Sequence, residues 1–178
     1  MDDLRPIGLT GAIAGGKTTV LRMLADLGLR TASSDLIARE IFHEDSMQDA
    51  LARRLGEPKP VLPATLRTAM LRDPGLRRWT NQAMHPLVGE RLAKIEVDVV
   101  EVPLLFEACL QGRYREVWTA SCGPAERKRR LHERYGLYAD LNALGSWQLS
   151  ERVKNALADR VVRTDHPSEH VLRFLMVE

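Results

Sequence analysis

A glycine-rich segment near the start of the chain has the residue types and the spacing of a phosphate-binding loop. It reads Gly-Ala-Ile-Ala-Gly-Gly-Lys-Thr over residues 11–18 and follows the short apolar run Ile7–Thr10. Glycines let the backbone wrap closely around phosphates, since no Cβ atom is in the way, and the backbone N–H groups then point at the anion. We expect Lys17 to place its ammonium on the outer phosphates and Thr18 to offer its hydroxyl to Mg²⁺.

A glycine-rich turn without a ligand is the alternative interpretation of this segment. Average residue usage makes a chance match on the order of one in a hundred for a chain of this length, and a strand before the loop with a helix after it makes chance a still poorer explanation. We therefore predict that the loop binds the phosphates of ATP, with the terminal phosphate passed to a small molecule. The expected contacts are Gly11, Ala14, Gly15, Gly16, Lys17, Thr18 and Thr19.

Two acidic residues at the ends of predicted strands are candidates for the acceptor and metal site. Asp35 comes just after the run Leu29–Ser33, and Glu101 stands near the end of the run Val97–Val102. Ligands of open parallel sheets gather at the carboxyl ends of the strands, where a carboxylate can orient an acceptor hydroxyl and hold Mg²⁺ through water. For Asp35 the alternative is a helix N-cap, because Ser-Ser-Asp precedes an amphipathic segment.

Three arginines in the predicted helix 124–135 form a candidate phosphate clamp. Arg127, Arg130 and Arg134 stand at positions i, i+3 and i+7, so they share one helix face. Guanidinium groups bind phosphates through paired hydrogen bonds. The alternative is a solvated face on which these arginines pair with Glu126 and Glu133.

The elements that must position these residues alternate between short apolar runs and amphipathic segments. Predicted strands cover residues 7–10, 29–33, 97–102, 117–120 and 160–163, and predicted helices include 18–27, 35–42, 124–135 and 169–176. Strands that alternate with helices indicate a parallel sheet covered on both faces. The sequence therefore predicts an α/β fold, a three-layer P-loop NTPase core with a parallel sheet.

The stretch between the second and third predicted strands is too long for a simple crossover. Its pattern is helical: Ser46 is expected to cap a helix that ends at Gly56, Asp73-Pro74 to start another, and Pro86 to break what precedes it. We expect one kinase domain, with its core at about 1–45 and 95–178, a helical substrate-binding insertion at about 46–94 and a lid at about 124–158. His85 could donate to a substrate phosphate, although a lone histidine is more often structural.

Composition argues against several function classes. The 178 residues carry a net charge of +2 and only 5% are aromatic, so neither a general attraction to nucleic acid nor a base-stacking platform is expected. Cys109 and Cys122 have no metal or redox spacing, which favours a reducing, cytoplasmic setting. We find no apolar run of the kind that targets or anchors a chain to a membrane. The expected partners are small molecules, and the expected state is a monomer.

Several segments together resemble the dephospho-coenzyme A kinase family. The most specific match is Val-Pro-Leu-Leu-Phe-Glu at residues 102–107. Matches in the same order along the chain are residues 7–20, residues 35–40, Asn81 with His85-Pro86, the arginine-helix residues Arg130, Arg134 and Gly136, and then Gln148, Lys154 and Ala158-Asp159. The resemblance covers nearly the whole chain.

This resemblance implies a nucleoside-monophosphate-kinase-like core that uses ATP to phosphorylate the ribose 3′-hydroxyl of dephospho-coenzyme A, the last step of coenzyme A synthesis. The catalytic residues expected from the motifs and the resemblance together are Asp35, Lys17, Arg130 and Arg134, and the expected substrate contacts are His85, Leu105, Phe106 and Glu107. The Mg²⁺ ligands expected from the loop and from the strand ends are Thr18, Asp35 and Glu101. For Glu107, a surface position on the next helix is the alternative.

Three departures from the family pattern leave other functions open. Ser33 stands where the family usually has a second acid, Leu144 where it has a lid arginine, and Arg127 where it has glutamine. One alternative is a kinase of the same fold for another small-molecule acceptor. The other is a weakly active nucleotide- or coenzyme-binding regulator. Lys17, Thr18 and Asp35 favour an active enzyme over the regulator.

Overall fold

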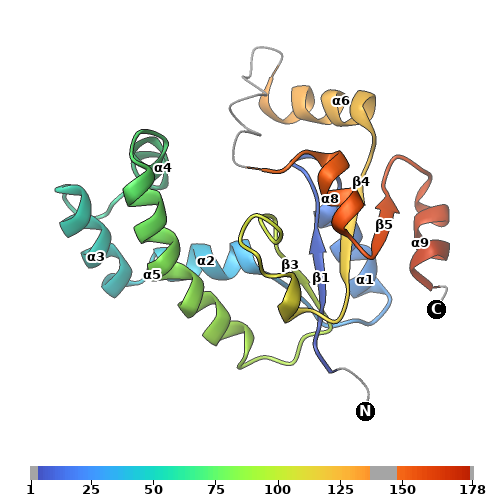
Figure 1. Ribbon diagram of the computed structural model, residues 1–178, viewed down its shortest axis with the longest axis horizontal. Helices are drawn as coiled ribbons and strands as arrows, with labels where there is room; N and C mark the ends of the chain where they lie inside the picture. Colours follow the sequence, from blue (N-terminus) through green and yellow to red (C-terminus); the bar gives the residue numbers. More distant parts are fainter. Residues whose placement is uncertain (1–3, 137–147, 177–178) are drawn as a thin grey trace. The chain divides into compact units, whose positions relative to one another are not determined.

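The computed structural model describes residues 4–136 and 148–176 and divides into two compact units. The sheet unit comprises Met1–Ser33 and Val97–Glu178, and the helical unit comprises Ser34–Glu96 (Figure 1). The expected insertion at about 46–94 falls within the helical unit. The lid expected at about 124–158 stays a prediction, since residues 137–147 lie outside the described ranges.

The sheet unit is built on five parallel strands in the order β2-β3-β1-β4-β5. The strands are β1 (Ile7–Thr10), β2 (Thr31–Ser33), β3 (Val99–Glu101), β4 (Val117–Ser121) and β5 (Arg160–Arg163). In register, Leu9 lies beside Glu101 and Trp118, and Ser33 lies on the other side of Glu101. The carboxyl ends of the strands therefore meet at one edge, as predicted, although β2 and β3 are shorter than the apolar runs that contain them.

Helices cover both faces of the sheet. Those described in this unit are α1 (Lys17–Asp26), the short 3₁₀ helix η1 (Gln111–Arg113), α6 (Pro124–Tyr135), α8 (Glu151–Leu157) and α9 (Ser168–Met176). Apolar residues of α1 and α9 join Leu9, Trp118 and Val162 in one buried cluster. Because side chains alternate across a strand, Thr119 and Ser121 point to the opposite face, where α8 lies (Figure 1). The predicted three-layer arrangement is confirmed.

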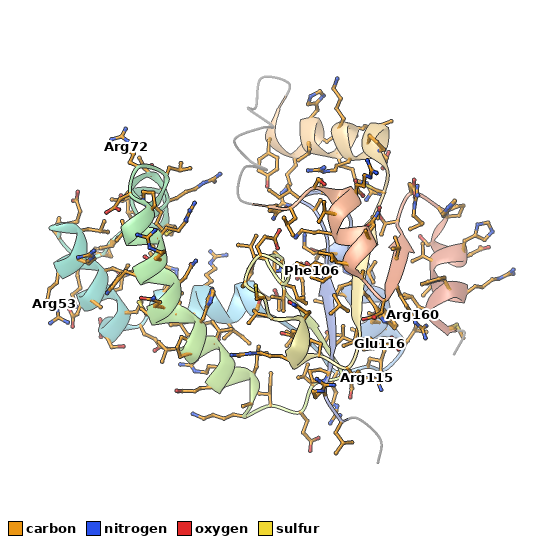
Figure 2. All side chains as sticks on the ribbon, in the orientation of Figure 1. Arg53, Arg72, Phe106, Arg115, Glu116 and Arg160 are labelled. Carbon is orange, nitrogen blue, oxygen red and sulfur yellow. The ribbon has the colours of Figure 1, made fainter. Side chains whose placement is uncertain are left out.

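The amino ends of β4 and β5 are joined by a charged pair next to an aromatic ring (Figure 2 labels Glu116 and Arg160). Arg160 Nε lies 3.5 Å from Glu116 Oε2, and the guanidinium carbon lies 5.2 Å from the centroid of the Trp118 ring. The indole N–H of Trp118 donates to the same carboxylate oxygen at 2.7 Å. Both charged side chains are about a third exposed, so the pair contributes little through its charge and mainly covers the buried indole.

The helical unit consists of four helices around its own core. They are α2 (Ser34–Phe42), α3 (Asp45–Leu55), α4 (Pro63–Arg72) and α5 (Pro74–Leu92). Gly56 ends α3 in the left-handed conformation as predicted, with φ 68°, but the N-cap of α3 is Glu44 and not Ser46. Asp73 caps α5 as predicted, since its carboxylate accepts from the N–H of Gly75 at 2.7 Å. Within the described residues, we find no helix that combines the length and apolar character needed to cross a membrane.

The predicted break at Pro86 is wrong, because α5 runs through it from Pro74 to Leu92. Proline inside a helix removes one backbone hydrogen bond and costs about 3 kcal/mol. Packing offsets this cost, since Met84, Leu87 and Val88 all pack against the buried cluster of the unit. The core of the helical unit therefore overrides a local preference of the backbone.

A buried glutamine holds two backbone groups of the helical unit. Gln48 is 5% exposed; its Nε2 donates to the carbonyl oxygen of Phe42 at 2.8 Å, and its Oε1 accepts from the N–H of Val61 at 2.8 Å. These bonds satisfy polar groups of buried residues. They also connect the end of α2 with the segment before α4.

We predict that Gln48→Leu lowers the free energy of unfolding by roughly 2–4 kcal/mol, because two buried backbone groups lose their partner at about 1–3 kcal/mol each. Urea denaturation followed by circular dichroism measures the change. Gln82→Leu is the matched control at an exposed position of α5, and it should change stability by less than about 0.5 kcal/mol. Similar losses in both variants would contradict the role given to Gln48.

Candidate active site

The phosphate loop joins β1 to α1 along a path that two glycines make possible. At Gly11, a Cβ atom would stand 2.4 Å from the carbonyl oxygen of Ala120. Gly16 is the N-cap of α1 with φ 94°, and a Cβ atom there would stand 2.5 Å from Thr164 Oγ1. Any larger residue at either position would push the loop away from the ends of β4 and β5. These glycines therefore serve the packing of the loop as well as the approach of phosphate.

Lys17 turns its side chain back onto the loop. Its Nζ donates to the carbonyl oxygens of Gly11 at 3.0 Å and Ala12 at 3.2 Å. The ammonium is thus held beside the backbone that would receive the phosphates, and phosphate oxygens can replace the two carbonyls. Thr18 and Thr19 follow on the exposed first turn of α1.

Two arginines of α6 hold the loop from outside. Arg127 Nε donates to the carbonyl oxygen of Ile13 at 3.1 Å. Arg130 donates to Thr164 through Nη1, at 3.0 Å from Oγ1, and through Nη2, at 2.7 Å from the carbonyl oxygen. The Thr164 hydroxyl donates in turn to the carbonyl oxygen of Gly15 at 2.9 Å. Arg130 therefore supports the phosphate loop through Thr164.

The other arginines of α6 have exposed surroundings. Arg134 lies over the ring of its neighbour Tyr135, 5.3 Å from the centroid, so its catalytic role stays a prediction. Arg129 pairs with Glu126 and with Glu133 on the surface. Hydrogen bonds from Arg129 and Arg130 lower the pKa of Glu126 to about 2. Glu126 therefore remains ionised near neutral pH and helps to orient Arg130, whose Nε lies 2.8 Å from it.

The two predicted acidic residues come at the ends of β3 and β2. Glu101 is the last residue of β3 and is 9% exposed. Asp35 is exposed and comes two residues after Ser33, the end of β2. The N-cap interpretation of Asp35 is wrong, because α2 already begins at Ser34 and Asp35 lies in its first turn. A carboxylate there interacts favourably with the helix dipole.

The Pro-Leu-Leu-Phe-Glu segment follows β3 as a series of turns. Leu105 is fully buried and Phe106 is 9% exposed, and Figure 2 labels Phe106 within the sheet unit. Glu107 accepts from Lys154 Nζ at 2.9 Å and from the N–H of Leu149 at 2.7 Å. Its side chain is only 14% exposed, so the alternative of a surface residue on a following helix is wrong.

Three predicted positions have less structural detail. His85 is exposed on α5 of the helical unit, so its contact with substrate stays a prediction. Leu144, which stands where the family pattern has an arginine, lies outside the described residues. The roles of Leu105 and Phe106 toward the substrate also stay predictions, and their burial means that packing is at least part of what they do.

Sequence reasoning missed two residues that hold the loop. Thr164 received no role, although it directly follows β5 at the edge where ligands gather. Gln148 was noted only as part of the resemblance, yet its Oε1 accepts from the N–H of Ile13 at 3.0 Å. The rule about carboxyl ends of strands could have found Thr164, whereas no local signal points to Gln148.

The family model and the curated relatives indicate the same family. The family model described as dephospho-CoA kinase matches residues 5–169. A dephospho-CoA kinase from Gloeobacter violaceus is 36% identical over an alignment of 183 positions, gaps included, which covers 94% of this chain and 87% of that protein. One from a Synechococcus species is 34% identical over 181 residues, covering 92% and 86%. The crystal structure of TT1252 from Thermus thermophilus has a TM-score of 0.80 at 27% identity, covering 97% of this chain and 94% of that one.

Neighbouring arginines of α6 offer a matched test of the loop contacts. We predict that Arg130→Ala lowers kcat for phosphoryl transfer about 10²-fold, the scale of one lost preorganised donor, because the Thr164 support of the loop is lost. Arg129→Ala removes only exposed ion pairs and should change kcat less than about twofold. Steady-state kinetics with saturating ATP measure both.

The same series decides whether Arg134 belongs to the clamp. Sequence spacing places it with Arg130, so Arg134→Ala is predicted to lower kcat well beyond the Arg129→Ala control. Equal, small losses from all three alanine variants would mean that the arginine stripe is a solvated surface.

Proposed function

The chain belongs to the dephospho-CoA kinase family, and we propose that it transfers the γ-phosphate of ATP to the ribose 3′-hydroxyl of dephospho-CoA through the residues described above. One observation carries this proposal: the phosphate loop and the Pro-Leu-Leu-Phe-Glu segment leave neighbouring strands at the same edge. The loop follows β1 and the segment follows β3, and these strands pair in parallel. Donor and acceptor recognition are therefore adjacent in the sheet unit.

The loop binds the β- and γ-phosphates. Its N–H groups and the amino end of α1 supply the first contacts, and Lys17 exchanges its two backbone carbonyls for phosphate oxygens. The ammonium then offsets charge on these oxygens as the bond to the γ-phosphate loosens. Arg127 and Arg130 keep the loop in shape and add positive charge beside it.

Mg²⁺ is a hard cation that prefers hydroxyl, carboxylate and water oxygens. Thr18, Glu101 and Asp35 would hold the ion, directly or through water. Bound Mg²⁺ neutralises charge on the phosphates during transfer. Among residues 4–136 and 148–176, no three or more His, Cys, Asp or Glu side chains are grouped so that they could hold a metal ion.

Asp35 orients the acceptor hydroxyl and accepts its proton. Its carboxylate is exposed on the first turn of α2, directly after β2, where the chain passes from the sheet unit to the helical unit. Ser33 takes the place of the second acid that the family pattern contains, so Asp35 would carry this task without that neighbour.

The reaction is tested by incubating the protein with ATP, Mg²⁺ and dephospho-CoA and identifying the products by mass. We expect coenzyme A and ADP to appear in equal amounts. Lys17→Ala should nearly abolish both while the circular dichroism spectrum stays unchanged, because the phosphates lose their mobile cation. Formation of ADP only with some other hydroxyl acceptor would overturn the assignment of the substrate.

A second test addresses Asp35. We predict that Asp35→Asn lowers kcat roughly 10²-fold, the usual scale for a general base, with little change in the Kd of ATP. Asp26→Asn, at the exposed end of α1, is the matched control and should leave kcat unchanged. A variant that loses only thermal stability would show that the Asp35 carboxylate serves the α2 dipole alone.

A further inference from the structure

A fully buried lysine connects α8 with the Pro-Leu-Leu-Phe-Glu segment. Lys154 is 0% exposed. Its ammonium donates to the carbonyl oxygen of Pro103 at 2.6 Å and pairs with Glu107 Oε1 at 2.9 Å. Lysine is almost never fully buried unless it is paired, so this position needs an explanation.

The start of α8 and the residues before it contact both sides of the active site. On the donor side, Gln148 accepts from the N–H of Ile13 in the phosphate loop at 3.0 Å. On the acceptor side, Leu149 and Lys154 both bond to Glu107. The stretch from 148 to 154 therefore bridges the phosphate loop and the segment after β3.

The segment is also tied to the strand that leads into the phosphate loop. The hydroxyl of Thr10, the residue before Gly11, donates to the carbonyl oxygen of Pro103 at 3.2 Å. Pro103 thus receives one bond from β1 and one from Lys154. Any movement of Lys154 would change the position of the segment relative to the loop.

Stability alone does not account for a charged pair at this place. Burial lowers the pKa of Lys154, and the neighbouring Glu107 opposes that shift. Apolar residues of similar volume often replace a buried ion pair without loss of stability, and a pair can instead serve to specify one geometry. Glu107 Oε2 is buried without a hydrogen-bond partner among the described residues, and buried acceptors are rarely left so.

We propose that Lys154 is a positioning residue that holds Pro103 and Glu107 in the geometry that binds the acceptor nucleotide. This inference rests on the proposed function, because it assumes that the segment after β3 contacts dephospho-CoA. Lys154 touches no reacting atom; it acts through Glu107 and through the backbone of Pro103. Loss of its ammonium should weaken acceptor binding and leave ATP binding intact.

The test compares Lys154→Met, which keeps the length of the side chain but lacks the charge, with the wild type and with Lys154→Arg. We expect Lys154→Met to raise the KM for dephospho-CoA about tenfold, the scale of one lost buried hydrogen bond, while the Kd of ATP changes less than about twofold. Lys154→Arg retains a cation with several donors and should recover most of the KM. Lys128→Met, an exposed lysine of α6, is the control and should match the wild type.

Each outcome has a distinct meaning. An unchanged KM for dephospho-CoA in Lys154→Met, or equal losses for ATP and dephospho-CoA, would overturn the positioning role. If Lys154→Met does not fold, Lys154→Gln takes its place, because its amide retains a donor for Pro103. Its KM for dephospho-CoA and its Kd for ATP are then compared with those of the wild type. A wild-type protein that forms no coenzyme A would refute the proposed function itself, whichever values the variants give.

Discussion

The site depends on the fixed path of the backbone between Gly11 and Gly16. N–H groups bind a phosphate strongly only when they already point in the required directions, since each group that must reorganise on binding loses affinity. In this protein, neighbouring residues at the ends of β4 and β5 determine this path. The carbonyl of Ala120 leaves no room for a Cβ at Gly11, Thr164 leaves none at Gly16, and Arg130 holds Thr164 in place. Much of the packing at the carboxyl edge can be understood as support for this loop.

The charged groups near the loop are each paired. Arg130 and Glu126 are partly exposed and Lys154 is fully buried, and each has a charged partner or a backbone oxygen within hydrogen-bond distance. Partial removal of Arg130 from water strengthens its attraction to a phosphate, because water screens that attraction less. The sheet unit therefore concentrates cations around the loop without a large net charge on the chain as a whole, which is +2.

The helical unit is stabilised by its own core and by its own buried polar contacts, among them those of Gln48 and Thr80. The buried residues of that core do not include the phosphate loop, so substitutions among them are expected to act on the stability of the helical unit and not directly on the loop. The family assignment selects dephospho-CoA among the acceptors that the sequence pattern had left open.

The sequence by itself determined what depends on neighbours along the chain: the phosphate loop, the alternation of strands and helices, the glycine that ends α3 and the acid-proline start of α5. These signals are local, since loop wrapping, capping and burial of alternate residues act over a few residues. The tertiary structure alone decided that α5 continues through Pro86, that Glu107 is mostly covered and paired with Lys154, that Arg130 meets the loop through Thr164, and that Lys154 is hidden from solvent. Each of these results needs segments far apart in the chain, as with Thr164 and Gly15 or Lys154 and Pro103. The free energy gained when these segments pack together outweighs the local backbone preferences, and a sequence signal reports only those local preferences.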